Sequence, residues 1–250
     1  MKNRSSEEET SDNQQYRHGL SRPIPSQRIT TMPLSSIEYL PEAHATIAIW
    51  QMIETDKQMF ASFPHLERHR AEAESRFTSA TRKMEFLAIR QLLFLVTEGK
   101  TCDIGYHASG KPYLINAHPA IGKKTFISIS HTKGYACLML STEHEVGIDI
   151  EIVSNRIEKV ASRFLRKDEM APDIHTKLIH WCAKEAFYKI FSEAHLQAND
   201  IRIEPFETST QGSIAVRNML SDTMHVMDYR LTDHYVLTYG TGSKNDSSQD

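Results

Sequence analysis

The sequence predicts an α+β protein made of two similar lobes, each a small antiparallel sheet with helices. A helical pattern followed by strand patterns occurs twice along the chain. Two short segments of similar sequence close these blocks, KGYACL at 133–138 and DHYVLT at 233–238. The similarity is too short to prove a repeat by itself. It favours an N-terminal lobe over residues 29–145 and a C-terminal lobe over residues 146–240.

The composition narrows the class of protein. A chain of 250 residues, 40% of them hydrophobic, can bury one large core or two small ones. Both ends, residues 1–28 and 241–250, are polar and poor in large apolar side chains, so we expect them to be disordered. The formal net charge of −3 argues against a general nucleic-acid-binding surface.

Several features that the sequence lacks indicate the cellular compartment. The sequence has no run of about eighteen apolar residues that could span a membrane, and its N-terminus lacks the apolar core of a signal peptide. The cysteines, Cys102, Cys137 and Cys182, are odd in number and unclustered, which argues against a disulfide framework or a zinc site. We therefore expect a cytoplasmic protein with no membrane partner.

The N-terminal lobe is predicted to combine strands with helices. Residues 45–53 are rich in β-branched and aromatic side chains and predict a strand, with a buried helix as the alternative. Residues 67–96 predict one long helix or two consecutive helices. The Gly-Lys-Pro sequence at 110–112 indicates a turn. Residues 125–130 and 135–140 predict strands, joined by a turn at 131–134.

The C-terminal lobe starts with a predicted strand that contains Asp149. Residues 156–165 predict an amphipathic helix, because apolar side chains recur on one face. A further helix is predicted over residues 175–192, and residues 200–239 predict several short strands.

Three carboxylates in this second half lie at positions that suit a divalent metal ion. Side chains alternate along a strand, so Asp149 and Glu151 share one face while the intervening isoleucines face the other way. Glu185 lies on the predicted helix, and Lys189 is its i, i+4 neighbour.

Converging carboxylates repel one another unless a cation binds or a proton is shared. Loss of one acid, for example Asp149, should therefore relieve repulsion and leave the fold intact. Oxygen ligands from one or two acids together with a substrate phosphate suit Mg²⁺. The alternatives are an edge strand with solvated acids and a helix with ordinary surface charge.

Together, the two segments form a recognisable pair of motifs. Residues 147–151 read GIDIE, and residues 181–189 read WCAKEAFYK. This pair resembles the signature of the surfactin-type 4′-phosphopantetheinyl transferases. Further matches are the GKP turn at 110–112, the strand 127–132 that ends in Ser-His-Thr, and a basic helical stretch at 76–90. The resemblance runs from about residue 33 to residue 239.

The resemblance implies both a fold and an activity. Surfactin-type enzymes are pseudo-dimers of two similar lobes with the active site in the cleft between them, and the two-lobed chain is expected to be a monomer. They use Mg²⁺ to transfer the phosphopantetheine arm of coenzyme A to a serine of an apo acyl or peptidyl carrier protein, releasing 3′,5′-ADP. The sequence does not indicate which carrier is used.

The resemblance also implies roles for individual residues. Asp149, Glu151 and Glu185 would hold the metal. Glu185 would also take the serine proton, with a metal-bound water as the alternative base, and Lys189 would stabilise or protonate the leaving phosphate.

Other residues would bind coenzyme A by the same resemblance. Lys111 would make this contact rather than remain a solvated turn residue, and His131 would bind phosphate rather than only cap a turn. Arg82 is favoured over Lys83 for the 3′-phosphate, because a guanidinium binds phosphate through two parallel hydrogen bonds. The full set of expected coenzyme A contacts is Arg70 (the weakest candidate), Arg82, Lys83, Lys111, Pro112, Ser130, His131 and Lys189.

The predicted helix at 156–165 suggests a docking surface. Basic side chains recur on its polar face and just beyond it, at Arg156, Lys159, Arg163 and Arg166. Carrier proteins are typically acidic around their serine, so this ridge would steer a carrier toward the site. An ordinary solvated helix face is the alternative.

Two other classes of function use similar residues. A metal-dependent phosphodiesterase or nuclease would normally carry more acids and histidines and a basic surface. A non-catalytic module that binds coenzyme A or a carrier would be expected to have lost Asp149, Glu185 or Lys189, and all three are present.

Overall fold

The computed structural model describes residues 34–122 and 124–242. The N-terminal extension at 1–28, and all of the predicted tail beyond residue 242, lie outside the described residues. The first tail residue, Thr241, is the last residue of a strand.

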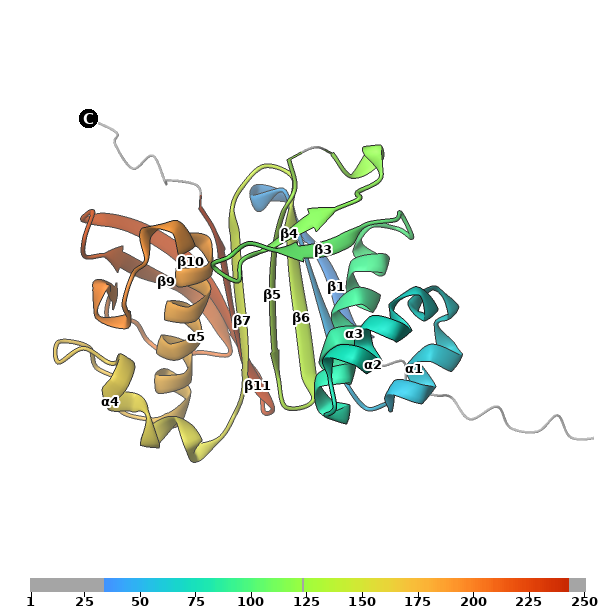
Figure 1. Cartoon of the computed structure of the whole chain (residues 1–250). Helices are drawn as coiled ribbons and strands as arrows, with labels where there is room; N and C mark the ends of the chain where they lie inside the picture. The colour runs from blue at the N-terminus through green and yellow to red at the C-terminus, as the bar shows by residue number, and fades with distance from the viewer. Residues whose placement is uncertain (1–33, 123, 243–250) are drawn as a thin grey trace, which may run out of the picture. The chain divides into compact units, whose positions relative to one another are not determined.

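Two antiparallel sheets form the centre of the described region (Figure 1). The first has the order β1-β2-β6-β5, with β1 at Leu34–Leu40, β2 at Ala45–Gln51, β6 at Tyr135–Ser141 and β5 at Phe126–Thr132. The second has the order β7-β11-β10-β9-β8, with β7 at Val146–Ile152, β11 at Tyr235–Thr241, β10 at Thr223–Leu231, β9 at Gln211–Asn218 and β8 at Ile201–Ile203. A separate hairpin pairs β3 (Asp103–Tyr106) with β4 (Pro112–Ile115).

Helices cover the outer faces of both sheets (Figure 1). The first sheet packs against α3 (Ala80–Val96), with α1 (Asp56–Ser62) and α2 (Arg70–Arg76) beside it. The second sheet packs against α5 (Ile174–Ile190) and the short α4 (Ala161–Phe164). Short 3-10 helices connect these elements at Pro41–Ala43, Pro64–His69, Pro119–Ile121, Asn155–Lys159, Ser192–Ala194 and Ala198–Asp200.

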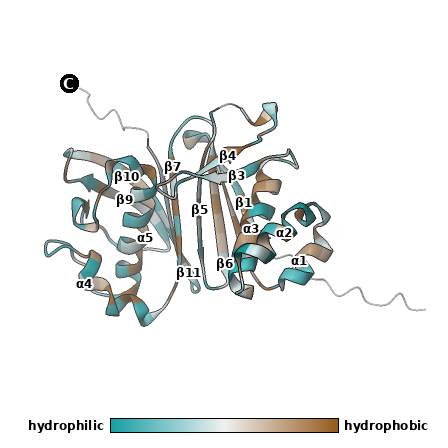
Figure 2. Cartoon of the chain, in the orientation of Figure 1, coloured by the Kyte–Doolittle hydropathy of each residue, from teal (hydrophilic) through white to brown (hydrophobic). Residues whose placement is uncertain are grey.

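Three hydrophobic cores hold these layers together. One lies between α3 and the first sheet, and one between α5 and the second sheet. The third lies between the two sheets and is built from alternate residues of β2, β6, β7 and β11, including Ile148 and Ile150, which are completely buried. Figure 2 shows the hydrophobic residues along these strands and along α3. The period-two pattern therefore buries the isoleucines of β7 and leaves its acids on the other face.

The same order of elements occurs twice. In the first half, β2 is followed by α3 and by the hairpin of β5 and β6, whose second strand pairs with β2. In the second half, β7 is followed by α5 and then by the hairpin of β10 and β11, whose second strand pairs with β7. The two segments of similar sequence begin β6 and β11, and the rings of Tyr135 and Tyr235 lie 4.9 Å apart. The predicted α+β class is confirmed; the lobe boundary at 145/146 stays a prediction.

Most predicted elements are present, with shifted bounds. Residues 45–51 form a strand rather than a buried helix. The predicted helical region at 67–96 is divided into Pro64–His69, α2 and α3, and the extended backbone at Phe77 and Ser79 separates α2 from α3. The strands after residue 200 include β9 and β10, which are eight and nine residues long.

Two local predictions were wrong. Residues 156–165 do not form one helix, because a 3-10 helix ends at Lys159 and only Ala161–Phe164 is α-helical. The apolar residues still pack inward, with Ile157 and Phe164 buried. His131 lies in β5, not in a turn, because Thr132 pairs with Tyr135 and leaves only two residues between the strands. None of the described helices is long and apolar enough to cross a membrane.

Candidate active site

Asp149 and Glu151 lie along the line where β7 meets β5. The two strands run beside each other as members of different sheets, and hydroxyl groups of β5 reach across. Ser130 donates to Asp149 over 2.7 Å, and Thr132 donates to Glu151 over 2.8 Å. Ser128 accepts a hydrogen bond from a backbone N–H of β7. The roles of Ser128 and Thr132 were missed, although the Ser-x-Ser-x-Thr alternation in residues 128–132 is a period-two signal.

Helix α5 brings a lysine to the same place. Lys189 Nζ donates to Asp149 Oδ1 and to the carbonyl of Ile148, each over 2.8 Å. Burial lowers the pKa of Lys189, but the charge and hydrogen bond of Asp149 outweigh this effect, and the net shift is upward. The lysine is therefore held in its charged form.

Gly147 explains why α5 can lie this close to β7. A Cβ atom at this position would lie 2.0 Å from the backbone oxygen of Ala186 in α5. Only glycine avoids that overlap. The first residue of the GIDIE motif thus sets the distance between the strand that carries the acids and the helix that carries Glu185 and Lys189.

The other two acids carry raised pKa values. Burial raises the pKa of Glu151 and of Glu185, and the negative charge of Asp149 raises both further. Hydrogen bonds from Thr132 and Trp181 partly offset the shift at Glu151. The three carboxylates therefore repel one another, as the sequence predicts.

Asp149 differs from the other two acids because it has a cation beside it. Its removal would leave the largely buried Lys189 ammonium without a carboxylate, which is costly. The predicted relief of repulsion therefore applies most directly to Glu151 and Glu185, whereas at Asp149 the lost pair with Lys189 opposes it, and the expectation for Asp149 stays a prediction.

The residues can be tested for their fit to a metal ion. Within residues 34–122 and 124–242, no group of three or more His, Cys, Asp or Glu side chains is arranged to hold one. Asp149 Oδ2, however, is buried and has no hydrogen-bond partner in the described part of the chain. Mg²⁺ needs only one or two protein carboxylates when a substrate phosphate supplies further oxygens. The donor set fits such an incomplete protein shell.

A pocket of about 350 Å³ gathers five of the predicted residues. It is lined by the β3–β4 hairpin, by β5 and by α5. Lys111 Nζ, at the tip of the hairpin, pairs with Glu145 Oε2 just before β7 at 2.7 Å, which ties the hairpin to the second half. The five predicted residues are Lys111, Pro112, His131, Glu185 and Lys189.

His131 connects this pocket with a smaller one of about 100 Å³, because its side chain lines both. Its Nδ1 lies 3.5 Å from Glu85 Oε2. Burial lowers the pKa of His131 and the charge of Glu85 only partly offsets this, so the imidazole is neutral near pH 7. Arg76 and Arg82 also line the smaller pocket.

Some predicted residues lie elsewhere. Arg70 lines neither pocket, because it pairs with Glu67 and lies over the ring of Phe60. Lys83 also lines neither pocket, whereas Arg82 does, although Arg82 pairs with Glu85. Ser130 contacts Asp149 instead of lining a pocket.

Lys184, inside the second motif, has a structural role that sequence reasoning missed. Its side chain is 3% exposed, and Nζ donates to Glu169 and to the carbonyls of Phe164 and Ala198. It thereby connects α5 to the loops on both sides. A lysine at a buried position of an amphipathic helix is the signal that could have shown this.

The predicted docking ridge is only partly present. Arg156, Lys159 and Arg163 are exposed, but they lie on two short helices instead of one. Arg166 pairs with Asp168 and donates to the carbonyl of Asn199, so it is a structural contact. Beside the ridge, a groove of about 280 Å³ is lined by apolar and polar residues, among them Lys133, Glu151, Arg156, Ile157, Val160 and Trp181. Trp181 also packs edge-on against Phe164, as expected for a core residue.

Comparison with known proteins finds a family model and a curated relative of similar description. Residues 145–240 match the family model of the 4′-phosphopantetheinyl transferase superfamily. That segment contains all three acids and Lys189. The chain is also 27% identical over 169 residues to a Synechocystis protein that is provisionally named a 4′-phosphopantetheinyl transferase. The match covers 63% of this chain and 65% of that relative's length.

Proposed function

We propose that this protein is a 4′-phosphopantetheinyl transferase of the surfactin type. It transfers the phosphopantetheine arm of coenzyme A to a serine of an apo carrier protein and releases 3′,5′-ADP. The observation that supports this most strongly is the pocket where Lys111, His131, Glu185 and Lys189 meet beside Asp149. These residues come from separate segments, and each matches a position of the family signature.

The cations of the two pockets suit the phosphates of coenzyme A. Lys111 and Lys189 carry fixed positive charge, and the neutral ring of His131 can donate one N–H to a phosphate oxygen. Arg76 and Arg82 in the adjoining smaller pocket suit the 3′-phosphate. The pair formed by Lys111 and Glu145 must open for Lys111 to reach a phosphate.

The acids suit Mg²⁺, which would be held by Asp149 and Glu151 with Glu185 at or beside the shell. When bound, the ion neutralises charge on the diphosphate and polarises the phosphoryl group. Asp149 Oδ2 has no hydrogen-bond partner among the described residues, which supports Asp149 as one ligand.

The chain's own residues account for the proton and the leaving group. The serine Oγ attacks the β-phosphorus of coenzyme A, and the bond from that phosphorus to the oxygen of 3′,5′-ADP breaks. Glu185 takes the serine proton, because its raised pKa makes it a stronger base than an ordinary carboxylate. Lys189 stabilises the charge that develops on the leaving phosphate.

The remaining parts of the proposal concern the partner and the setting. The carrier docks at the groove beside Trp181, where Arg156, Lys159 and Arg163 offer positive charge. The enzyme acts as a monomer in the cytoplasm. Both halves of one chain supply residues to the pocket, so a second copy is not needed.

Mass spectrometry tests the proposal directly. The full chain is mixed with an apo carrier protein, coenzyme A and Mg²⁺, and the carrier should gain one phosphopantetheine group. A carrier with serine replaced by alanine is the control and should gain nothing. Cleavage of coenzyme A without a carrier would instead indicate a phosphodiesterase, and binding without either change would indicate a non-catalytic module.

A further inference from the structure

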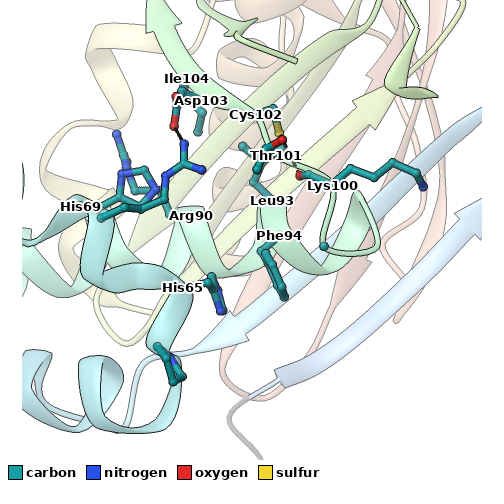
Figure 3. Close-up of a pocket in the computed structure, with 13 residues that line it drawn as sticks. His65, His69, Arg90, Leu93, Phe94, Lys100, Thr101, Cys102, Asp103 and Ile104 are labelled. Atoms are coloured by element: carbon teal, nitrogen blue, oxygen red, sulfur yellow. Dashed lines mark hydrogen bonds and ion pairs between the residues drawn. The ribbon is translucent and has the colours of Figure 1, made fainter. Parts of the chain in front are cut away.

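A second cavity lies further along α3, toward its C-terminal end. It has a volume of about 360 Å³ and is bounded by the 3-10 helix Pro64–His69, by α3 and by the segment that leads into β3 (Figure 3). None of its lining residues lines the larger active-site pocket, and only Arg90 also lines the smaller one. A volume above about 300 Å³ is sufficient for a small organic ligand.

Arg90 is a buried cation whose contact with its carboxylate partner, Glu72, is long, and Glu72 is shared with Arg76. Its side chain is 6% exposed and its guanidinium lies on the ring of Phe86, 3.2 Å from the centroid. Nη1 donates to the carbonyl of Phe86, while the carboxylate of Glu72 lies 3.7 Å away from Nη2. Among the residues that the structure describes, Nε has no acceptor. Burial lowers the pKa of Arg90 to about 10, and the charge of Glu72 only partly offsets this effect.

The matching position in the other half carries a buried cation whose hydrogen bonds are all satisfied. Counting from Ala80 and from Ile174, Arg90 and Lys184 are each the eleventh residue of a 17-residue helix. Lys184 is fully satisfied by Glu169, at 2.8 Å, and by two carbonyls. The two helices therefore bury a cation at the same position, but only Lys184 has a carboxylate, that of Glu169 in the segment before α5, within hydrogen-bond distance.

The surroundings of Arg90 favour an anion. Arg68 and Lys100 also line the cavity, and Arg68 is paired with Asp103. The pKa of His69 is lowered to about 4, first by burial and then by the charges of Arg90 and Arg68, which outweigh those of Asp103 and Glu72. His69 is therefore neutral at pH 7 and reports a positive local potential.

The rest of the cavity wall is apolar and aromatic. Leu93, Phe94 and Ile104 contribute to it, and the ring of His65 stacks on Phe94 with centroids 3.7 Å apart (Figure 3). Such a wall provides room for a flat or branched hydrocarbon group, but offers few acceptors for a purely polar ligand.

From these contacts we propose that the cavity is a second ligand site, which binds a small carboxylate or phosphate monoester with an apolar body. The anionic group lies against Arg90, and the apolar body lies against Phe94 and Leu93. Because Arg90 also lines the smaller active-site pocket, an occupied site would alter how that pocket binds an anion.

Histidine NMR of the full chain tests this proposal. Phenyl phosphate and phenylphosphonate serve as probes, because both stay anionic at the pH near 4 where His69 titrates; benzamide is the neutral control, and ionic strength is held constant with NaCl. Each anion should raise the pKa of His69 by about one unit or more in a saturable way, because an opposite charge enters its surroundings. Benzamide should leave the pKa of His69 unchanged. The signal of His131 reports separately on the active-site pocket.

Variants locate the site. Arg90→Lys keeps the charge but removes the Nε donor, and should weaken probe binding about tenfold. Lys100→Gln, at a half-buried side chain, should weaken probe binding roughly threefold. This second variant keeps the proposal testable if the Arg90 variant does not fold. Lys57→Gln, on α1 outside the cavity, is the matched control.

Two results would overturn the proposal. One is a pKa of His69 that changes no more with the anions than with NaCl. The other is a change in the signal of His131 alone. Neither depends on transferase activity. A negative carrier assay would therefore not contradict the second ligand site, and failure to detect ligand binding there would not contradict the transferase proposal.

Discussion

The two halves of the molecule use one arrangement of elements for different purposes. By register with β6 and β11, the counterparts of Asp149 and Glu151 in the first half are Ala48 and Trp50. Each pair points toward the helix of its own half. Ala48 and Trp50 are buried in a hydrophobic core, whereas the two acids meet charged and hydroxyl groups. The same backbone thus builds a packed core once and a cluster of charged and hydroxyl groups once.

The difference depends on what each helix supplies. The sixteenth residue of α5 is Lys189, and the sixteenth residue of α3 is Leu95. The lysine compensates Asp149, and a leucine at that point could not. A buried carboxylate is tolerated only where a partner is present. The comparison therefore teaches that the most buried acid of the strand, Asp149, depends on a matched cation in the covering helix, whereas Glu151 is held by the hydroxyl of Thr132.

The largest expected effect tests this requirement. Lys189→Leu places the first-half residue type in the second half and removes the contact with Asp149. Turnover in the carrier assay should fall about 10²- to 10³-fold, the range for loss of a preorganised electrostatic contact. Leu95→Met, at the matching position, should leave turnover nearly unchanged. Equal turnover in both variants would show that Lys189 serves only the fold.

The buried cations offer a test of stability. Lys184→Met leaves Glu169, whose side chain is fully buried, without its cation and should lower the free energy of unfolding by about 3–5 kcal/mol. Lys177→Met breaks the more exposed pair with Glu158 and should cost less than about 1 kcal/mol. Urea denaturation measures both. A small loss for Lys184→Met would mean that the motif lysine is not structural.

Close packing of α5 on β7 is the next point of difference. The first-half counterpart of Gly147, by register, is Thr46, which already carries a Cβ atom. Gly147→Ala should lower the free energy of unfolding by about 1–3 kcal/mol, because the new methyl group meets the backbone of α5. Thr46→Ala should have a smaller effect. Thermal denaturation of the two variants decides the comparison, and a neutral Gly147→Ala would contradict the close approach.

The smallest effect concerns pH. The first-half counterpart of Glu185, the twelfth helix residue, is Gln91. The pKa of Glu185 is raised above its unfolded value of 4.5, so the folded state holds this proton longer. Its contribution to stability is present below pH 4.5 and is lost as pH rises through the folded pKa. Glu185→Gln should therefore be modestly more stable than wild type at pH 7, while losing turnover.

Unfolding midpoints measured from pH 4 to pH 8 test the sign of this effect. The difference between wild type and Glu185→Gln should shrink toward pH 4, where Glu185 is protonated in both states. Glu193→Gln, outside the site, provides a control for the loss of an exposed acid. A difference that grows toward low pH would contradict the raised pKa.

Several features could be predicted from the sequence because they depend on local periodicity. Alternation in β7 separates Asp149 from Ile148, and the i, i+4 spacing joins Glu185 to Lys189 on one side of α5. The hairpin of β5 and β6 and the strand β2 follow from the same kind of pattern. These are short-range consequences of backbone geometry, and they hold wherever the segment lies.

Other features required contacts between distant segments, which no local pattern encodes. The pairing of Lys111 with Glu145, the position of Arg82 beside His131 and the hydroxyl contacts of β5 with β7 depend on how sheets and helices pack. The prediction of a single helix at 156–165 was wrong for the same reason. The apolar spacing indicates only that these side chains point inward, and a 3-10 helix followed by a short α-helix also places them there. The sequence by itself determined which residues share a face. Only the tertiary structure decided which charged groups each face contacts, because the packing of sheets and helices determines which residues become neighbours across an interface.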